Sequence, residues 1–347
     1  MLTKTTRAPL VLCGLLLIVL GPGCVASDKS VISQADQFNT GIKPAVIPQP
    51  NLDTYLQQIG GRIVTAAKEL DREHVGPPLH FKDKDRSWMF SDIHFQLVNS
   101  KTLNAFTTGG HYVYIYNELF QMCKNEDELA AVMSHEYGHI YCRHVQKGTG
   151  RQQALVAAAL AAGGAGYLVG GKEHGQEYAA LGSTAGAGIG QFVNMGFTRE
   201  DEAQADEYGF KFYTRAGWPP EHFGDFFKEM IAAGYDKTPA IASDHPTLAS
   251  RVQAAEKRVA QLKPQDRQRT QPNIATPEQF AQYKQVANQA AKGLPDDQKV
   301  LQAKNLLQAL PRSCWVPYDP PDRDQAEQRL AADAQKAEQR QKQQSGG

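Results

Sequence analysis

Apolar positions repeat with helical and strand periods in separate segments of the chain. From Leu52 to Leu70 they recur three or four residues apart, which predicts an amphipathic helix. Residues 93–100 alternate apolar and polar positions, which predicts a half-buried strand. Residues 112–116 are β-branched and aromatic and follow a Gly-Gly turn, so they predict a second strand that pairs with the first. We therefore expect a small sheet flanked by helices.

Helical patterns dominate the rest of the chain. Asn125 predicts the start of a helix over residues 126–145, because its side chain can cap the backbone and Glu128 follows three residues later. Thr198 and Asp201 have the same relation at the start of another helix. Further helices are predicted in the Phe-rich segment 219–234 and in the segment 243–262, which has a proline in its first turn. Residues 277–310 predict a helical hairpin.

The N-terminal pattern predicts export. A basic start precedes the apolar run Leu10–Leu20, which is too short to span a bilayer as a stable helix and has the size of the central region of a secretory signal. Small residues then lead to Cys24, as in a bacterial lipoprotein signal. We therefore expect a periplasmic protein that is lipid-anchored at Cys24; Val25 after the cysteine favours the outer membrane. An ordinary cleaved signal peptide or an uncleaved anchor is the alternative.

Composition divides the chain into five parts. We expect a signal at residues 1–24, a polar linker at 25–50 and the main domain at 51–263. A C-terminal helical extension follows at 264–320, and then a polar tail at 321–347 that is disordered or a solvated helix. The Ala- and Gly-rich segment 152–190 is interpreted as small-residue helices packed against the body. Its glycines lower helicity and hydrophobicity, which disfavours a membrane span.

Charge and cysteine content narrow the possible partners. Lys+Arg and Asp+Glu both number 37, so the formal net charge is zero, which argues against nucleic acid as a main partner. Three cysteines follow Cys24, at 123, 142 and 314, and they allow at most one disulfide. No two of them are spaced as metal ligands usually are.

Candidate chemistry centres on "HEYGH" inside the helix predicted at 126–145. His135 and His139 lie four residues apart, so their imidazoles share one helix face and can bind one zinc ion at about 2.0–2.1 Å. Glu136 is offset by about 100°, so it can flank the metal and accept a proton from a metal-activated water. The alternative is a helix face with two solvated histidines.

A second acidic pair can complete this site. Glu202 and Asp206 lie four residues apart on the helix that Thr198 begins. Catalytic zinc takes three protein ligands and keeps an open position, and Glu202 can be the third ligand. Asp206 can accept a hydrogen bond from the free ring nitrogen of a ligand histidine. Alternatively, both are ordinary solvated acidic residues.

Several motifs, in order, resemble metallopeptidase family forty-eight. This family comprises HtpX-like and CAAX-prenyl-protease-like zinc peptidases, and the likeness is to the bacterial periplasmic branch that includes the β-barrel assembly-enhancing protease. The matching segments are "NAF" at 104–106, Gly109–Gly110, "NEDELAAVMSHEYGHIYCRH" at 125–144, "EDEAQADEYG" at 200–209 and "DHPTLASRV" at 244–252. The resemblance implies a gluzincin-type α+β fold, mostly helical, with a small sheet beside the HExxH helix. It also implies one Zn2+ per chain, with Glu202 as the third ligand and Glu136 as the catalytic base.

Two further residues take alternative roles from the resemblance. His245 matches a histidine that can occupy the open zinc position as a lock, or donate a hydrogen bond to an oxyanion; otherwise it is a loop residue that caps a helix. Arg251 matches an arginine near the site, or it forms a buried ion pair with an acidic residue. His144 and His111 are interpreted as structural.

The expected function is a zinc endopeptidase of the cell envelope that acts on extended, misfolded or unassembled polypeptides. The strand at 112–116 is expected to pair with substrate as an edge strand. The resemblance also implies the outer-membrane assembly machinery as a partner, although the long helical-repeat domain of that branch is not seen. The alternatives are a more specific processing protease and a chaperone-like or assembly lipoprotein whose metal site is latent, blocked by His245.

Overall fold

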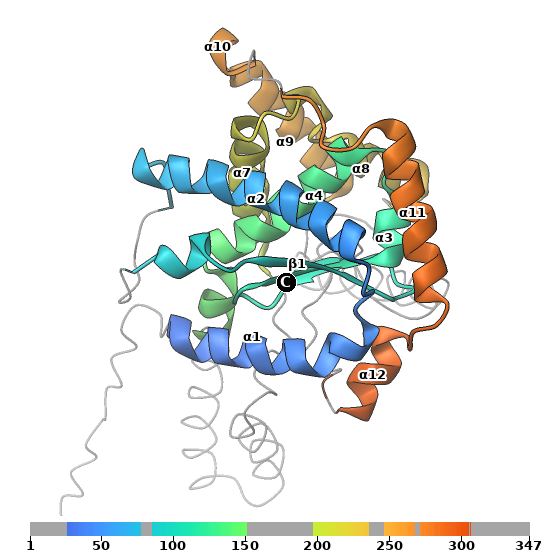
Figure 1. The fold of residues 1–347 in the computed structure, drawn as a ribbon. Coiled ribbons are helices and arrows are strands. Elements are labelled where there is room, and N and C mark those ends of the chain that lie inside the picture. Colours follow the sequence, from blue (N-terminus) through green and yellow to red (C-terminus); the bar gives the residue numbers. More distant parts are fainter. Residues whose placement is uncertain are drawn as a thin grey trace, which may run out of the picture.

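A computed structural model describes residues 26–77, 85–150, 197–235, 246–267, 271–304 and 306. Its centre is a three-stranded sheet of β1 (His94–Val98), β2 (Ala105–Thr107) and β3 (Tyr112–Tyr116) in the order β1-β3-β2. Strand β3 runs parallel to β1 and antiparallel to β2. Helices surround the sheet (Figure 1), so the predicted α+β, mostly helical class is confirmed.

The strand at 112–116 is the central strand, so the prediction that it offers a free edge is wrong. The outer edge of β1 is covered, because Ile47 N donates to Leu97 O (2.8 Å) and Asn99 N donates to Ala45 O (2.8 Å). Strand β2 is therefore the remaining edge in the described part of the sheet. The periodicity argument missed β2 because three residues are too few to show an alternation.

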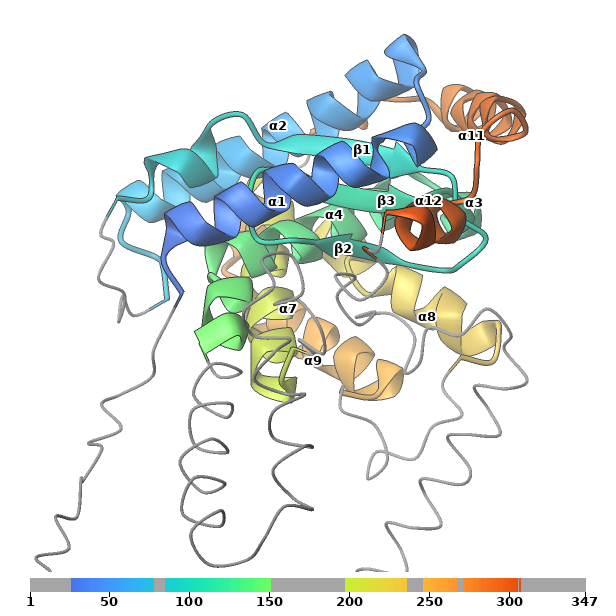
Figure 2. The ribbon, with the colours of Figure 1, turned by 90° about the horizontal axis from the view of Figure 1, so that it is seen from below.

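Helices cover both faces of the sheet (Figure 2). Helix α2 (Pro50–Arg72), which extends the helix predicted at 52–70, packs on the face that presents Phe95. It comes close there because Gly60 has no side chain, and a Cβ at this position would lie 2.1 Å from the Phe95 ring. Helix α4 (Glu126–Tyr141) packs beside α2 and against β2 and β3. The sheet thus supports the helix that carries "HEYGH".

The opposite face is covered by α1 (Asp28–Ile42), which lies inside the segment predicted to be a linker. The linker prediction is wrong for these residues. Val31, Phe38 and Ile42 are fully buried, and the Phe38 ring contacts Phe106 with the centroids 5.9 Å apart. The polar composition of the segment hid an apolar stripe of helical spacing.

Helix α4 ends at Tyr141, four residues before the predicted end. Arg143 adopts a left-handed backbone (φ 55°), and the chain turns there before it becomes helical again from His144. The Arg143 guanidinium donates to both carboxylate oxygens of Asp28, from Nε to Oδ1 (3.1 Å) and from Nη2 to Oδ2 (2.7 Å). Asp28 also accepts from Trp88 Nε1 (3.1 Å). The first turn of α1 therefore fixes the turn that follows α4.

The remaining helices lie mostly on the α4 side of the sheet. They are α3 (Asn117–Met122), α7 (Arg199–Arg215), α8 (Asp225–Ala232), α9 (Leu248–Gln261), α10 (Pro264–Arg267), α11 (Pro277–Ala291) and α12 (Asp297–Ala303), with 3-10 turns at Lys43–Ala45, Ser87–Phe90 and Pro220–His222. Helix α9 begins after the cap residue Thr247, so Pro246 precedes the helix and does not lie in its first turn. Helices α11 and α12 confirm that 277–310 contains two helices, but they do not fold back along each other as the predicted hairpin would (Figure 1).

Several predictions concern residues outside the described part. These are Cys24, His245, Cys314, the Ala- and Gly-rich segment and the polar tail. Within the described residues Cys123 and Cys142 are buried and form no disulfide. None of the helices described is both long enough and apolar enough to cross a membrane.

Candidate metal centre

Helices α4 and α7 pack very closely, and two glycines make this possible. A Cβ on Gly138 would lie 2.8 Å from Ala205 O, and a Cβ on Gly209 would lie 3.0 Å from the backbone of His135. A side chain at either position would therefore force the helices apart. The start of α7 is fixed by the predicted capping box, in which Thr198 and Asp201 exchange hydrogen bonds. The glycines thus bring the carboxylates of α7 to the histidines of α4.

His135, His139 and Glu202 converge in the space between these helices, and all three are fully buried. The two Nε2 atoms of the histidines lie 3.1 Å apart. The Glu202 carboxylate oxygens lie 3.5 Å from Nε2 of His135 and 3.8 Å from Nε2 of His139. Two ligand bonds of about 2.0–2.1 Å at a tetrahedral angle separate ligand atoms by about 3.3–3.4 Å. The three side chains therefore fit one shared metal ion.

Glu136 follows His135 on the same helix and is also fully buried. Bulk water therefore does not reach this carboxylate. Acidic side chains are almost never fully buried without a specific reason. A helix face of solvated histidines, the alternative considered from the sequence, is excluded by the burial of His135 and His139.

The second nitrogen of His135 contacts a buried carboxylate. Nδ1 of His135 lies 2.8 Å from Asp206 Oδ1. Arg251 holds the same carboxylate with two hydrogen bonds, from Nε to Oδ2 (2.9 Å) and from Nη2 to Oδ1 (2.6 Å). Burial favours protonation of Asp206, but the Arg251 charge and the hydrogen bond from His135 outweigh it and lower the pKa of Asp206 below its ordinary value. Asp206 therefore stays ionised in contact with the second nitrogen of His135.

Arg251 lies beside the candidate site and is paired there. It forms a buried ion pair with Asp206, and its Nη2 also lies 3.1 Å from Nδ1 of His135. Its guanidinium stacks 4.1 Å above the centre of the Phe227 ring, which fixes its position from α8. A residue far along the chain thereby supports the geometry of the histidine on α4.

The surroundings of His139 were not anticipated from the sequence. The Phe197 ring stacks on it, with the centroids 3.9 Å apart, and Nδ1 of His144 lies 2.9 Å from its Nδ1. Burial lowers the pKa of His144 to about 4, so this ring is neutral near pH 7. The signals in the sequence were the position of His144, five residues after His139, and its place at the end of the segment 125–144 that resembles the metallopeptidase family.

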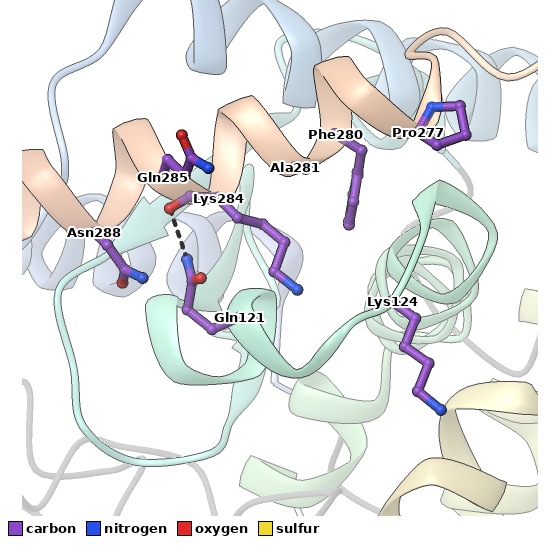
Figure 3. A pocket seen from close by; sticks show the side chains of 8 residues that line it. All are labelled: Gln121, Lys124, Pro277, Phe280, Ala281, Lys284, Gln285 and Asn288. Carbon is purple, nitrogen blue, oxygen red and sulfur yellow. Dashed lines mark hydrogen bonds between the residues drawn. The ribbon is translucent and has the colours of Figure 1, made fainter.

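A pocket of about 290 Å3 lies elsewhere, between α3 and α11 (Figure 3). Its lining includes Gln121, Phe280 and Lys284, and it shares no residue with the His135, His139 and Glu202 cluster. Gln121 Nε2 donates to Lys284 O (3.1 Å), and Lys284 Nζ donates to Cys123 O (2.7 Å). We interpret this pocket as part of the junction between the C-terminal helices and the body.

Sequence comparison agrees with this fold and metal cluster. Peptidase family M48 matches residues 83–259, which is just over half of the chain and includes α4, α7 and most of α9. The chain therefore belongs to peptidase family M48, a family of metalloendopeptidases.

Several individual proteins that resemble this chain are also named as proteases. The beta-barrel assembly-enhancing protease of Escherichia coli (strain K12) is 27% identical over 256 residues, which cover 73% of this chain and 48% of that protein. Metalloprotease LoiP of the same organism is 27% identical over 65% of this chain and 79% of that protein. The mitochondrial metalloendopeptidase OMA1 of Schizosaccharomyces pombe is 28% identical over 48% of this chain and 47% of that protein. The chain spans about half the length of the beta-barrel assembly-enhancing proteases that it matches.

Proposed function

We propose that this protein is a zinc-dependent endopeptidase of the cell envelope. The observation that carries the proposal is the buried convergence of His135, His139 and Glu202 at distances that suit one ion. Two imidazoles and one carboxylate are a common ligand set for catalytic zinc. These three side chains would hold Zn2+, and Asp206 would orient His135 through its second ring nitrogen.

Glu136 is proposed as the general base of the reaction. Bound Zn2+ supplies Lewis acidity, which lowers the pKa of a water molecule to about 7. Glu136 accepts a proton from the attacking water and then donates it to the amine nitrogen of the departing peptide. Its burial supports this role, because a carboxylate in a dry site retains the proton between the two steps.

Extended polypeptide is the proposed substrate. Strand β2 is the remaining edge of the described sheet and packs against α4. Its three residues are buried, so a peptide would pair with it, and bring a carbonyl toward the histidines, only after the cover of this edge moves aside. This mode favours misfolded or unassembled proteins, since a folded surface seldom presents a free strand. The name of the E. coli relative points to β-barrel assembly, and we extend that setting to this chain as part of the proposal.

The proposed location is the periplasm, with lipidation of Cys24 as the anchor and the outer membrane as the favoured bilayer. The support is the order of basic, apolar and small residues before Cys24. Labelling with a radioactive fatty acid tests this part, and a Cys24→Ala variant that keeps the label contradicts it.

Casein cleavage by purified protein, with metal analysis of the same sample, tests the activity. We expect about one Zn2+ per chain and a fall in rate of roughly 10²–10⁴-fold in Glu136→Gln, the range for loss of a general base. Glu118→Gln is the matched control, because Glu118 is an exposed glutamate on α3, and it should keep the wild-type rate. Equal rates in wild type and Glu136→Gln contradict the proposal. Bound zinc without any cleavage favours the latent, chaperone-like alternative.

A further inference from the structure

The two candidate histidine ligands are supported in chemically different ways. Nδ1 of His135 contacts the Asp206 carboxylate, the usual partner of a metal-binding histidine. Nδ1 of His139 contacts another imidazole, that of His144, at 2.9 Å. His144 is fully buried, and its Nε2 lies 2.9 Å from Gln204 Oε1 on α7.

Donors and acceptors can be assigned consistently from His139 through His144 to Gln204. Nε2 of His139 faces Nε2 of His135, so a metal bound there requires the ring proton of His139 on Nδ1. Nδ1–H of His139 then donates to Nδ1 of His144, whose own proton must lie on Nε2. That proton is donated to Gln204 Oε1.

Lys147 supports the assigned orientation of Gln204. Its ammonium can only donate, and its Nζ lies 3.0 Å from Gln204 Oε1. This contact identifies the atom facing both Lys147 and His144 as the amide oxygen. Two hydrogen bonds thus run from His139 through His144 to Gln204, and the hydrogen bond from Lys147 to Gln204 is consistent with both.

The turn after α4 is what places His144 beside His139. In an uninterrupted helix a residue five positions later lies about 140° around the axis, where its ring could not reach the same face. The left-handed backbone at Arg143 breaks the helix before His144, and the ion pair with Asp28 holds that turn. A left-handed residue other than glycine is uncommon, and here the buried ion pair with Asp28 accounts for it.

We propose that His144 is a positioning residue, which fixes the Nδ1–H tautomer and the ring orientation of His139 for metal binding. This inference rests on the proposed metal site. His144 then does for His139 what Asp206 does for His135, but with an imidazole in place of a carboxylate. Gln204 completes the arrangement by fixing the tautomer of His144.

Zinc affinity of the purified protein tests this proposal, measured by competition with a chelating dye. His144→Leu, which cannot accept the hydrogen bond, should bind Zn2+ about 10–100-fold more weakly than wild type. His144→Gln retains a side-chain acceptor and should recover part of the loss. His111→Leu is the matched control and should keep wild-type affinity, because His111 lies in the turn before β3 and packs against Trp88.

Two further measurements separate positioning from folding. Gln204→Met removes the acceptor for His144 and should weaken zinc binding less than His144→Leu does, with an unchanged melting temperature of the metal-free protein. Nitrogen-15 spectra of the zinc-loaded wild type should show His139 protonated at Nδ1. Wild-type affinity in both His144→Leu and Gln204→Met, or a proton on the other nitrogen of His139, would overturn the role of His144. Absence of zinc binding by the wild type would instead overturn the proposed metal site.

Discussion

Two buried glutamates at helix α4 have different neighbours. Glu126, in the first turn of α4, is 1% exposed, and Glu202, on α7, is fully buried beside the middle of α4. Glu126 receives four hydrogen bonds, from Tyr55 OH, Trp218 Nε1 and the backbone N–H groups of Ile274 and Ala275, at 2.8–3.1 Å. Glu202 faces two imidazole nitrogens at 3.5 and 3.8 Å. Burial alone therefore does not identify a site, and the chemistry of the neighbouring atoms does.

The Glu126 contacts explain how the C-terminal segment is attached. Two of its four donors come from residues 274 and 275, just before α11, and Trp218 is held in turn by the Arg62 guanidinium 4.1 Å above its ring. The carboxylate therefore links the start of α4 to the C-terminal helices. We infer that Glu126 serves stability and that Glu202 serves metal binding, and the predictions below test this division.

Replacement of Glu202 should have the largest effect. Glu202→Gln removes the charged ligand, so zinc affinity should fall by at least about 100-fold, more than is usual for a residue that only supports a ligand. Casein cleavage should fall below detection. The metal-free variant should be at least as stable as the metal-free wild type, because a neutral amide avoids the cost of burying a charge. Chelator competition and urea unfolding measure the two quantities, and a large loss of metal-free stability would contradict the division.

Replacement of Glu126 should give the reverse result. Glu126→Ala leaves four donors without their acceptor, three of them buried, so the free energy of unfolding should fall by roughly 3–5 kcal/mol. Zinc affinity of the molecules that remain folded should stay within about twofold of wild type, since the cost falls on stability. Glu118→Ala, on an exposed position of α3, is the control for loss of a glutamate side chain. A weakened metal site in folded Glu126→Ala would show that the two ends of α4 are coupled.

Asp206 lies between these extremes, because it supports a ligand without facing the metal directly. Asp206→Asn keeps an oxygen near Nδ1 of His135 but removes the charge that Arg251 and His135 share. We expect zinc affinity to fall by about 10–100-fold. Asp225→Asn is the matched control, since Asp225 pairs with His222 and Lys228 near the surface. Equal zinc affinity in the two variants would remove Asp206 from the site.

Local patterns predicted the elements of the site but not the packing that brings them together. The spacing of His135 and His139, and the capped start of α7 with Glu202 and Asp206, depend on neighbours in sequence, and the structure brings these residues together. Gly138 sits inside "HEYGH" yet its role depends on Ala205, which is far along the chain. Such packing is invisible to periodicity, because it requires knowing which helices meet.

The turn at Arg143 and the helix α1 show the same limit. A helical pattern continued through residues 142–145, but the backbone turns because Asp28 provides a buried partner for Arg143. Likewise, the polar composition of residues 26–50 suggested a linker, whereas Phe38 and Ile42 are buried where α1 covers an apolar face of the sheet. In both cases a contact distant in sequence outweighed a local preference.

The smallest expected effect concerns Asp297, a buried carboxylate that, like Glu126, attaches the C-terminal segment. It accepts a hydrogen bond from Tyr116 OH and so joins α12 to β3. Burial raises the pKa of Asp297 above its ordinary value and outweighs the hydrogen bond from Tyr116. The folded protein therefore binds this proton more tightly than the unfolded chain. This contribution to stability is complete below about pH 4 and is lost as the pH rises through the raised pKa, by about 1.4 kcal/mol per unit of pKa difference. Urea unfolding at pH 4.5, 5.5 and 7 should show a smaller fall in Asp297→Asn than in wild type, whereas identical pH profiles would mean that Asp297 is ionised alike in both states.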